Sequence, residues 1–295
     1  MKTDFEVRSS TVSTFWHWIN ERHHVYLRKE RGVEKPWTAD KVLQEWKFTN
    51  VFRQLDRGTI ALKNMLKRLP DDASPELIAW TIIWYRLFNL DEHADDLAPG
   101  YMEHPDGLGA FLKTKQSNGK KIFTGAHMTT GVAGEDKLTT YSTAVRIAYA
   151  KANEIVDVCA QTNSLERVFK FLKDNLYMVG PFVAYEIVCD FRFTMLLDCA
   201  GDILTWANVG PGAKRGMKRL GFEPSVETMC KLYDAALDQL GKHLVPHLPS
   251  RFTDESADYP PFELREIEHS LCEFDKYERV RLEQGRPRQR YPGWV

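Results

Sequence analysis

Two glycine-rich turns are the segments of this chain best suited to hold a phosphate group. The first is Val179-Gly180-Pro181, and the second is Gly210-Pro211-Gly212, which leads into the basic run 214–219. A turn that opens a helix exposes backbone N–H groups, and helix starts of this kind attract phosphate. Lys214 and Arg215, beside the second turn, add positive charge that a nucleic-acid backbone could use. The pattern therefore favours DNA or RNA as the ligand over a free metabolite.

Asp202 is the carboxylate that the sequence places best for chemistry. It follows the Gly180 turn by about twenty residues. A glycine turn between two helices is the geometry of a helix-hairpin-helix. The spacing resembles that of the helix-hairpin-helix DNA glycosylases, in which a catalytic Asp follows the hairpin. The segment after Asp202 ends in Lys218-Arg219-Leu220-Gly221, similar to the Arg-Leu-Gly-like end of the same segment in those enzymes.

Plainer interpretations stand beside these. The Gly180 turn can be an ordinary connection between helices, and Asp202 can be a helix N-cap. The chain also departs from the glycosylases, because no clear hairpin lysine follows Gly180 and no iron–sulfur spacing of cysteines is present. Glycosidic cleavage is therefore not our first expectation.

Arg53 and Arg57 form a second candidate phosphate site. They are four residues apart in a helix predicted over 40–57, so they would share one face of it. Two parallel guanidiniums can clamp a phosphate or a pyrophosphate. Asp56 can pair with Arg53, and the same side chains could equally form a buried ion-pair network that joins helices.

The helix predicted over 264–283 carries many charges, a pattern typical of a solvated face. Glu268 and His269 could serve acid–base chemistry there, although no spacing requires it. His243 and His247 have Pro246 between them, and the chain has no HExxH, CxxC or GxxxxGK[ST] motif. We therefore predict no metal and no cofactor, and we expect neither ATP chemistry nor a dinucleotide fold.

The elements that must position these residues belong to a globular chain with a balanced charge. Its 295 residues are 43% hydrophobic, enough for one large core or two modest ones. A charged fraction of 27% and a mean hydropathy of −0.42 argue against a disordered chain. Because the net charge is −1, a nucleic-acid site must be a local basic patch.

Membrane insertion and export are not expected. No apolar run approaches the roughly 20 residues that span a bilayer, and the first ten residues have no apolar signal core. We expect a cytoplasmic protein, in an infected host cell if a phage encodes it. The five cysteines lie far apart, which indicates reduced, buried thiols.

Helical periodicity dominates and convincing strands are scarce, so we predict an all-α fold. The organisation is a single helical domain over 1–295, or two helical lobes with a cleft between them. Residues 98–140 are expected to be a partly irregular insertion, and 284–295 a basic flexible tail. The expected helices are 11–31, 40–57, 77–90, 142–161, 165–175, 225–244 and 264–283. Ser74-Pro75-Glu76 is expected to begin the helix 77–90, which is apolar nearly all round and should therefore be central. Asn163-Ser164 is expected to cap the helix 165–175.

Several blocks together resemble the alpha-glutamyl/putrescinyl thymine pyrophosphorylase family, which is also known as the helical domain associated with bacteriophage 5-hydroxymethyluracil DNA kinases. The resemblance covers about residues 15–279. The blocks that carry it are FTNVFRQLDRGT (48–59), IIWYRLFN (82–89), VGPFVAYEIVCDF (179–191), DILTWANVGPGAKRG (202–216) and FELREIEHSLCEFDKYER (262–279).

This resemblance implies a helical fold related to the helix-hairpin-helix DNA glycosylases and a role in thymine hypermodification. In that pathway a separate kinase phosphorylates or pyrophosphorylates 5-hydroxymethyluracil in DNA. A family member then displaces the leaving group with an amine, such as an amino acid or putrescine. The implied partners are double-stranded DNA carrying the modified thymine, an amino acid or polyamine as co-substrate, and a DNA kinase.

The candidate residues suit such a transferase. The target base must be flipped out of the duplex, and Tyr185, Trp206 or Trp84 would line its pocket. The departing phosphate needs donors, which would be Arg53, Arg57, or the Gly210–Gly212 turn with Lys214 and Arg215. Asp202 would deprotonate the amine, or stabilise positive charge on the base. The alternatives are a non-catalytic DNA-binding partner of the kinase and a glycosylase-like base-excision enzyme.

Overall fold

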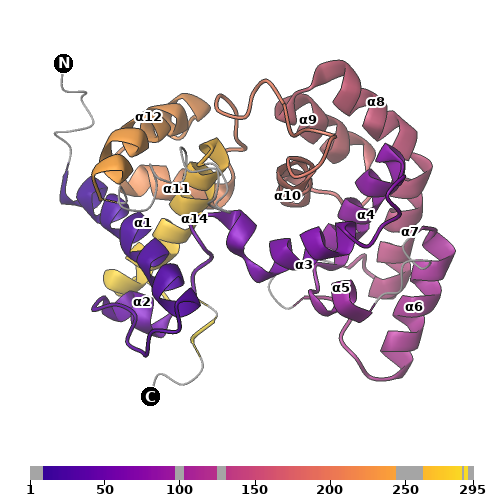
Figure 1. Ribbon diagram of the computed structural model, residues 1–295, viewed down its shortest axis with the longest axis horizontal. Helices are drawn as coiled ribbons and strands as arrows, with labels where there is room; N and C mark the ends of the chain where they lie inside the picture. Colours follow the sequence, from indigo (N-terminus) through magenta and orange to yellow (C-terminus); the bar gives the residue numbers. More distant parts are fainter. Residues whose placement is uncertain (1–8, 97–102, 125–130, 244–261, 288, 292–295) are drawn as a thin grey trace. The chain divides into compact units, whose positions relative to one another are not determined.

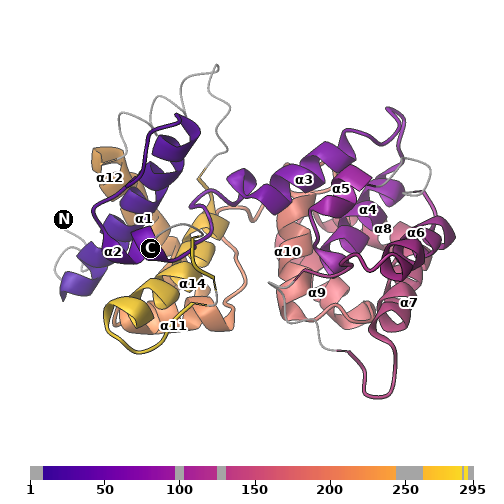
Figure 2. The same ribbon diagram turned by 90° about the horizontal axis from the view of Figure 1, so that it is seen from below.

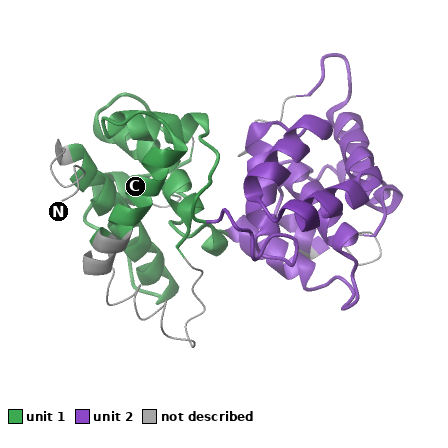
Figure 3. Ribbon diagram, turned by 90° about the horizontal axis from the view of Figure 1, so that it is seen from above, with its two compact units in different colours: residues 1–56, 204–295 green, residues 57–203 purple. Residues whose placement is uncertain are grey.

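The computed structural model describes residues 9–96, 103–124, 131–243, 262–287 and 289–291. Its elements are helices, and within these residues the only extended pairing is one antiparallel bridge between Trp46 and Arg290. The all-α prediction is therefore confirmed. The chain forms two compact units, residues 1–56 with 204–295 and residues 57–203 (Figure 3).

The first unit is built around α14 (Leu264–Arg281), which packs against the four other α-helices that the structure describes in this unit (Figures 1 and 2). A 3-10 turn, η2 (Arg53–Leu55), lies in the segment after α2. The four helices are α1 (Ser9–Glu30), α2 (Lys41–Glu45), α11 (Pro211–Arg219) and α12 (Val226–His243).

The charges of α14 are not a solvated face, and that expectation is wrong. Most of the helix is buried because it lies at the centre of the unit. Its charged side chains are paired or hydrogen-bonded instead, as buried charges must be. The buried charged residues are Glu263, Arg265, Glu266, Glu268, Glu273, Asp275 and Glu278.

The second unit surrounds α4 (Pro75–Phe88), as its nearly continuous apolar sequence predicted. Every residue from Ala79 to Phe88 is buried, and α3, α7, α8 and α10 pack on it. The predicted start is also confirmed, because the Ser74 hydroxyl accepts a hydrogen bond from the Leu77 N–H at 3.3 Å. The other helices are α3 (Arg57–Leu66), α5 (Glu92–Asp96), α6 (Pro105–Ser117), α7 (Lys137–Ala150), α8 (Ala152–Thr162), α9 (Leu165–Asn175) and α10 (Pro181–Phe191).

The predicted helix 40–57 is wrong. Helix α2 ends at Glu45, and Trp46 has extended backbone angles because it pairs with Arg290. The Lys47 N–H donates to the Gln289 carbonyl, so the described part of the 284–295 tail is attached to this segment. The apolar residues of this segment have helical spacing, but they enter the core from an extended chain. The spacing of apolar residues alone cannot distinguish these two cases.

Smaller differences concern the second unit. The predicted helix 142–161 is two helices, α7 and α8, which meet at Lys151. The predicted insertion 98–140 contains the regular helix α6, and residues 98–102 and 125–130 lie outside the described residues.

All five cysteines are free thiols, but only Cys159 is buried and Cys199 is exposed. None of the described helices has the length and apolar composition that crossing a bilayer requires.

Candidate functional site

The predicted site residues divide between the two units. Those of the first unit are Arg53, Trp206, Gly210, Gly212, Lys214 and Arg215. Those of the second unit are Arg57, Trp84, Gly180, Tyr185 and Asp202.

Gly180 lies in the turn between α9 and α10, two helices that pack on each other. It is the N-cap of α10, makes no side-chain cap, and is followed by Pro181 as the first helical residue. The backbone N–H groups at this helix start therefore lack a capping side chain. The turn also exposes an aromatic side chain, because Phe182 is 54% exposed.

Asp202 caps helix α9 through both of its carboxylate oxygens. It accepts hydrogen bonds from the Ser164 hydroxyl at 2.7 Å, the Leu165 N–H at 2.7 Å and the Glu166 N–H at 3.0 Å. A carboxylate at a helix N-terminus satisfies N–H groups that have no partner within the helix. These contacts support the capping alternative, at the start of a different helix from the one that follows Asp202. The catalytic role stays a prediction.

The two aromatic residues predicted for the base pocket in this unit lie in its core. Trp84 is fully buried and Tyr185 is 4% exposed. Arg57 is at the surface, with a side chain that is 82% exposed and paired with Asp91. Contact with a flipped base would require movement around Trp84 and Tyr185, so their stacking role stays a prediction, whereas Arg57 is accessible as it stands.

Arg53 and Arg57 do not share a helical face. Arg53 lies in the 3-10 turn, Asp56 after it has extended backbone angles, and Arg57 begins α3. The guanidinium of Arg53 donates to Asp56 at 2.7 Å, as the sequence suggested. The paired-guanidinium clamp predicted at these two positions is therefore not formed by one helix.

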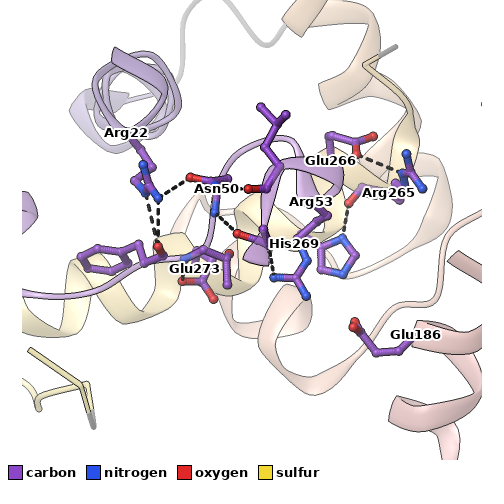
Figure 4. A network of polar contacts seen from close by, with 12 residues as sticks. Arg22, Asn50, Arg53, Glu186, Arg265, Glu266, His269 and Glu273 are labelled. Atoms are coloured by element: carbon purple, nitrogen blue, oxygen red, sulfur yellow. Dashed lines mark hydrogen bonds and ion pairs between the residues drawn. The ribbon is translucent and has the colours of Figure 1, made fainter. Parts of the chain in front are cut away.

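Asp56 belongs to a part-buried polar network in the first unit, of which Figure 4 labels Arg22, Asn50 and Arg53. Its second oxygen accepts the Asn50 N–H at 2.8 Å, and the Asn50 side chain accepts a hydrogen bond from Arg22. Burial raises the pKa of Asp56, and the charge of Arg53 partly offsets this effect. The contacts around Arg53 thus favour the ion-pair alternative over the clamp, although the pair of Arg53 with Asp56 is only part-buried.

His269 extends this polar region on α14 (Figure 4). Its Nδ1 lies 2.8 Å from the backbone carbonyl of Arg265. A carbonyl can only accept, so the contact places a proton on Nδ1 and gives neutral His269 its lone pair at Nε2. The carboxylate of Glu268 is 3.8 Å from Nδ1.

Helix α11 shows why its glycines are needed. It begins after Gly210 with no side-chain cap, and its buried face meets α14. A Cβ on Gly212 would lie 2.2 Å from the Cys272 Sγ, and one on Gly216 would lie 2.3 Å from the Leu271 carbonyl oxygen. Both glycines therefore permit close contact between the two helices.

The opposite face of α11 is exposed and basic. Lys214, Arg215 and Lys218 point to solvent. Neither lysine forms an ion pair with any residue that the structure describes. Trp206, in the segment before the helix, is partly exposed and so is the most accessible of the three predicted pocket aromatics. The predicted residues Lys214 and Arg215 thus lie together on one surface, and Lys218 joins them.

Arg219 and Asp275 also belong to this region. Sequence reasoning named Arg219 only as part of the basic run 214–219 and assigned no role at the site to Asp275. Asp275 of α14 pairs with Arg215 at 2.8 Å and with Arg219 at 2.7 Å. The four-residue spacing of the two arginines was a signal for them. No local pattern indicated Asp275, because it lies 56 or more positions from the two arginines in the sequence.

Among the described residues no cluster of three or more His, Cys, Asp or Glu side chains could hold a metal ion.

Comparisons with known proteins agree on one family. A family model for the helical domain of 5-hmdU DNA kinase matches residues 9–286. A protein named 5-hmdU DNA kinase, from Bacillus phage SP10, is 28% identical over 303 residues, which cover 90% of this chain and 45% of that protein. The chain thus spans a little under half the length of this relative. No solved structure matches.

Proposed function

This chain belongs to the family of 5-hmdU DNA kinase helical domains, and on that premise we propose that it takes part in thymine hypermodification of DNA. The reaction that we assign to it is a transfer to phosphorylated 5-hydroxymethyluracil. The nitrogen of an amine attacks the exocyclic methylene carbon. The bond from that carbon to oxygen breaks, the phosphate or pyrophosphate leaves with the electron pair, and a base takes a proton from the amine.

The observation that carries this proposal is the extent of the family match. The family model covers nearly the whole chain, and the match to the relative that bears the name of a kinase covers less than half of that relative. The chain has no GxxxxGK[ST] loop for ATP phosphates. A step that follows phosphorylation therefore suits this chain better than phosphorylation itself.

The basic face of α11 supports DNA as the substrate. The helix start at Gly210 offers N–H groups, and Lys214 and Arg215 add charge that can bind phosphate. Trp206 offers a partly exposed aromatic surface on which a flipped base could stack. Positioning and phosphate binding would supply much of the rate, because a phosphate at this activated methylene is a good leaving group.

We assign proton removal from the amine to His269, whose neutral form carries its lone pair on Nε2. Asp202, predicted for this role from the sequence, is the second candidate. Its oxygens would have to exchange capping hydrogen bonds for a proton. Variants of the two residues should therefore give different results.

A second candidate function is a non-catalytic one, in which the chain presents DNA to a kinase. The name of the relative and its greater length favour this alternative, because its kinase activity would then reside outside the matched part. In either case modified DNA is the ligand. The two functions differ only in whether this chain makes a new bond.

The experiment is nucleoside mass spectrometry. The purified protein is incubated with DNA containing 5-hydroxymethyluracil, a phage-type DNA kinase, ATP and a mixture of amino acids and polyamines. A new thymidine adduct that requires both proteins is the expected result. Phosphorylated base that stays intact would favour the DNA-presenting function, and abasic sites would favour a glycosylase.

A further inference from the structure

Arg215 and Arg219 are joined by a single buried carboxylate. They lie four residues apart on α11, so their side chains leave the same face of the helix. Nε of Arg215 donates to Oδ2 of Asp275 at 2.8 Å, and Nε of Arg219 donates to Oδ1 at 2.7 Å. The Nε of Arg279 is 3.5 Å from the same carboxylate. One residue of α14 thereby holds three guanidiniums.

The cluster carries excess positive charge at the protein surface. The Asp275 side chain is only 1% exposed, whereas that of Arg215 is 57% exposed. Burial raises the pKa of Asp275, but the hydrogen bonds from Arg215 and Arg219 outweigh it and leave the pKa below its ordinary value. The carboxylate is therefore ionised at neutral pH. Three guanidiniums around one carboxylate leave two positive charges uncompensated within the cluster.

The anchoring leaves both terminal amino groups of Arg215 and the Nη2 amino group of Arg219 for a ligand. Arg215 uses its Nε for Asp275, and its terminal amino groups donate to no acceptor among the described residues. Arg219 uses Nε for Asp275 and Nη1 for Gln284, at 2.9 Å. A guanidinium fixed through Nε is pre-organised, so it loses less freedom when it binds an anion.

We propose that Asp275 positions Arg215 and Arg219 as a seat for one phosphate group, taken from the DNA backbone or from the phosphorylated base. Paired guanidiniums match the oxygen geometry of phosphate. Lys214 and Lys218, on the same exposed face, would meet neighbouring phosphates. The inference rests on the proposed function only in taking DNA as the ligand, and Asp275 acts through the arginines as a positioning residue.

The first test is DNA binding by Arg215→Lys, measured by fluorescence anisotropy over a series of salt concentrations. Lysine keeps the charge but has neither the Nε anchor nor the planar fork. We expect about tenfold weaker binding with a nearly unchanged salt dependence, because the charge is kept and only the fixed geometry is lost. Arg146→Lys is the matched control, because its side chain is 56% exposed and paired with the exposed Asp106. It should bind DNA as the unaltered protein does.

DNA binding by Asp275→Asn is a second test, in which the change of charge and the loss of the seat have opposite effects on affinity. Removal of a negative charge should by itself tighten DNA binding, whereas loss of the seat should weaken it. Binding to an unmodified duplex and to a duplex with the phosphorylated base shows which phosphate the seat binds. Equal weakening on unmodified and phosphorylated DNA assigns the backbone, and weakening only on phosphorylated DNA assigns the base.

Unchanged or tighter binding of Arg215→Lys on both duplexes would overturn the seat. Its largely exposed side chain makes this variant informative even if Asp275→Asn fails to fold. Amine transfer is measured separately. Binding that depends on Arg215 without any transfer would contradict the proposed reaction but not the seat.

Discussion

A Cβ on Gly216 would lie 2.3 Å from the backbone carbonyl oxygen of Leu271. Real Cβ atoms do not approach a backbone oxygen so closely, and the oxygen belongs to the central helix of the unit. Helices α11 and α14 are therefore in contact through their backbones. The same contact turns the basic side chains of α11 outward, so the packing of one face determines the chemistry of the other.

Gly216→Ala should destabilise the first unit. The added methyl must push α11 away from α14, and overpacking of this kind costs about 1–3 kcal/mol. Gly109→Ala is the matched control, since Gly109 also lies inside a helix, α6, and a Cβ there meets nothing within 4 Å. Urea unfolding of both variants measures the difference. Equal stability of the two would contradict the close helix contact.

Asp202→Ala should leave the Leu165 and Glu166 N–H groups at the start of α9 without their acceptor, at a cost of about 1–2 kcal/mol in the free energy of unfolding. Asp202→Asn keeps one acceptor oxygen and should lose less. With His269 as the base, the folded Asn variant should retain amine transfer. Asp198→Asn, an exposed residue nearby, is the control for the change of charge. A folded Asp202→Asn without transfer would restore the catalytic role of Asp202.

His269→Gln should abolish most of the transfer while DNA binding persists. Glutamine can still donate to the Arg265 carbonyl, but it cannot take up a proton. The expected loss of rate is on the order of 100-fold or more. Single-turnover transfer and DNA binding are measured on the same preparations. Full activity of this variant would exclude His269 as the base.

Stability should fall in mild acid because of His93. This buried ring lies with Nε2 at 2.8 Å from the Ile122 carbonyl and Nδ1 at 3.2 Å from the Lys115 Nζ. Burial, with the Lys115 charge, lowers the pKa of His93 to about 4. The unfolded chain takes up this proton near its ordinary pKa of about 6.5, so acid favours unfolding.

The contribution of His93 to the free energy of unfolding is fully present above the pKa that His93 has in the unfolded chain. It is lost as the pH falls toward 4. Between about pH 7.5 and about pH 5 it should decrease by roughly 2 kcal/mol. Urea unfolding of the unaltered protein and of His93→Gln, at both pH values, measures it. The variant should lose less stability over this interval, and an identical loss would show that His93 is not the cause.

Local signals predicted some elements well. Ser74 and Ser164 were expected to cap α4 and α9, and both hydroxyls accept the expected backbone N–H. The helix start at Pro181 was likewise visible, because glycine and proline act within a few residues. Such elements are encoded where they occur, so a single sequence is sufficient to find them.

The remaining features depend on partners far away in the chain. The segment after α2 is extended because Trp46 and Lys47 pair with the C-terminal tail. Asp202 caps a helix that begins 37 positions before it. The charges of α14 are buried because other helices surround it. Residue pattern gives the types of these side chains but not the long-range contacts that decide their roles.

The most direct test of the central claim is transfer without the kinase. DNA is phosphorylated at 5-hydroxymethyluracil, purified from kinase and ATP, and incubated with this protein and ¹⁵N-labelled amines. Mass spectrometry of the nucleosides should detect a thymidine adduct that carries the heavy nitrogen, formed only when the protein is present. Phosphorylated base that remains unchanged, with the protein bound to the DNA, would contradict the transferase and leave the chain a DNA-presenting partner.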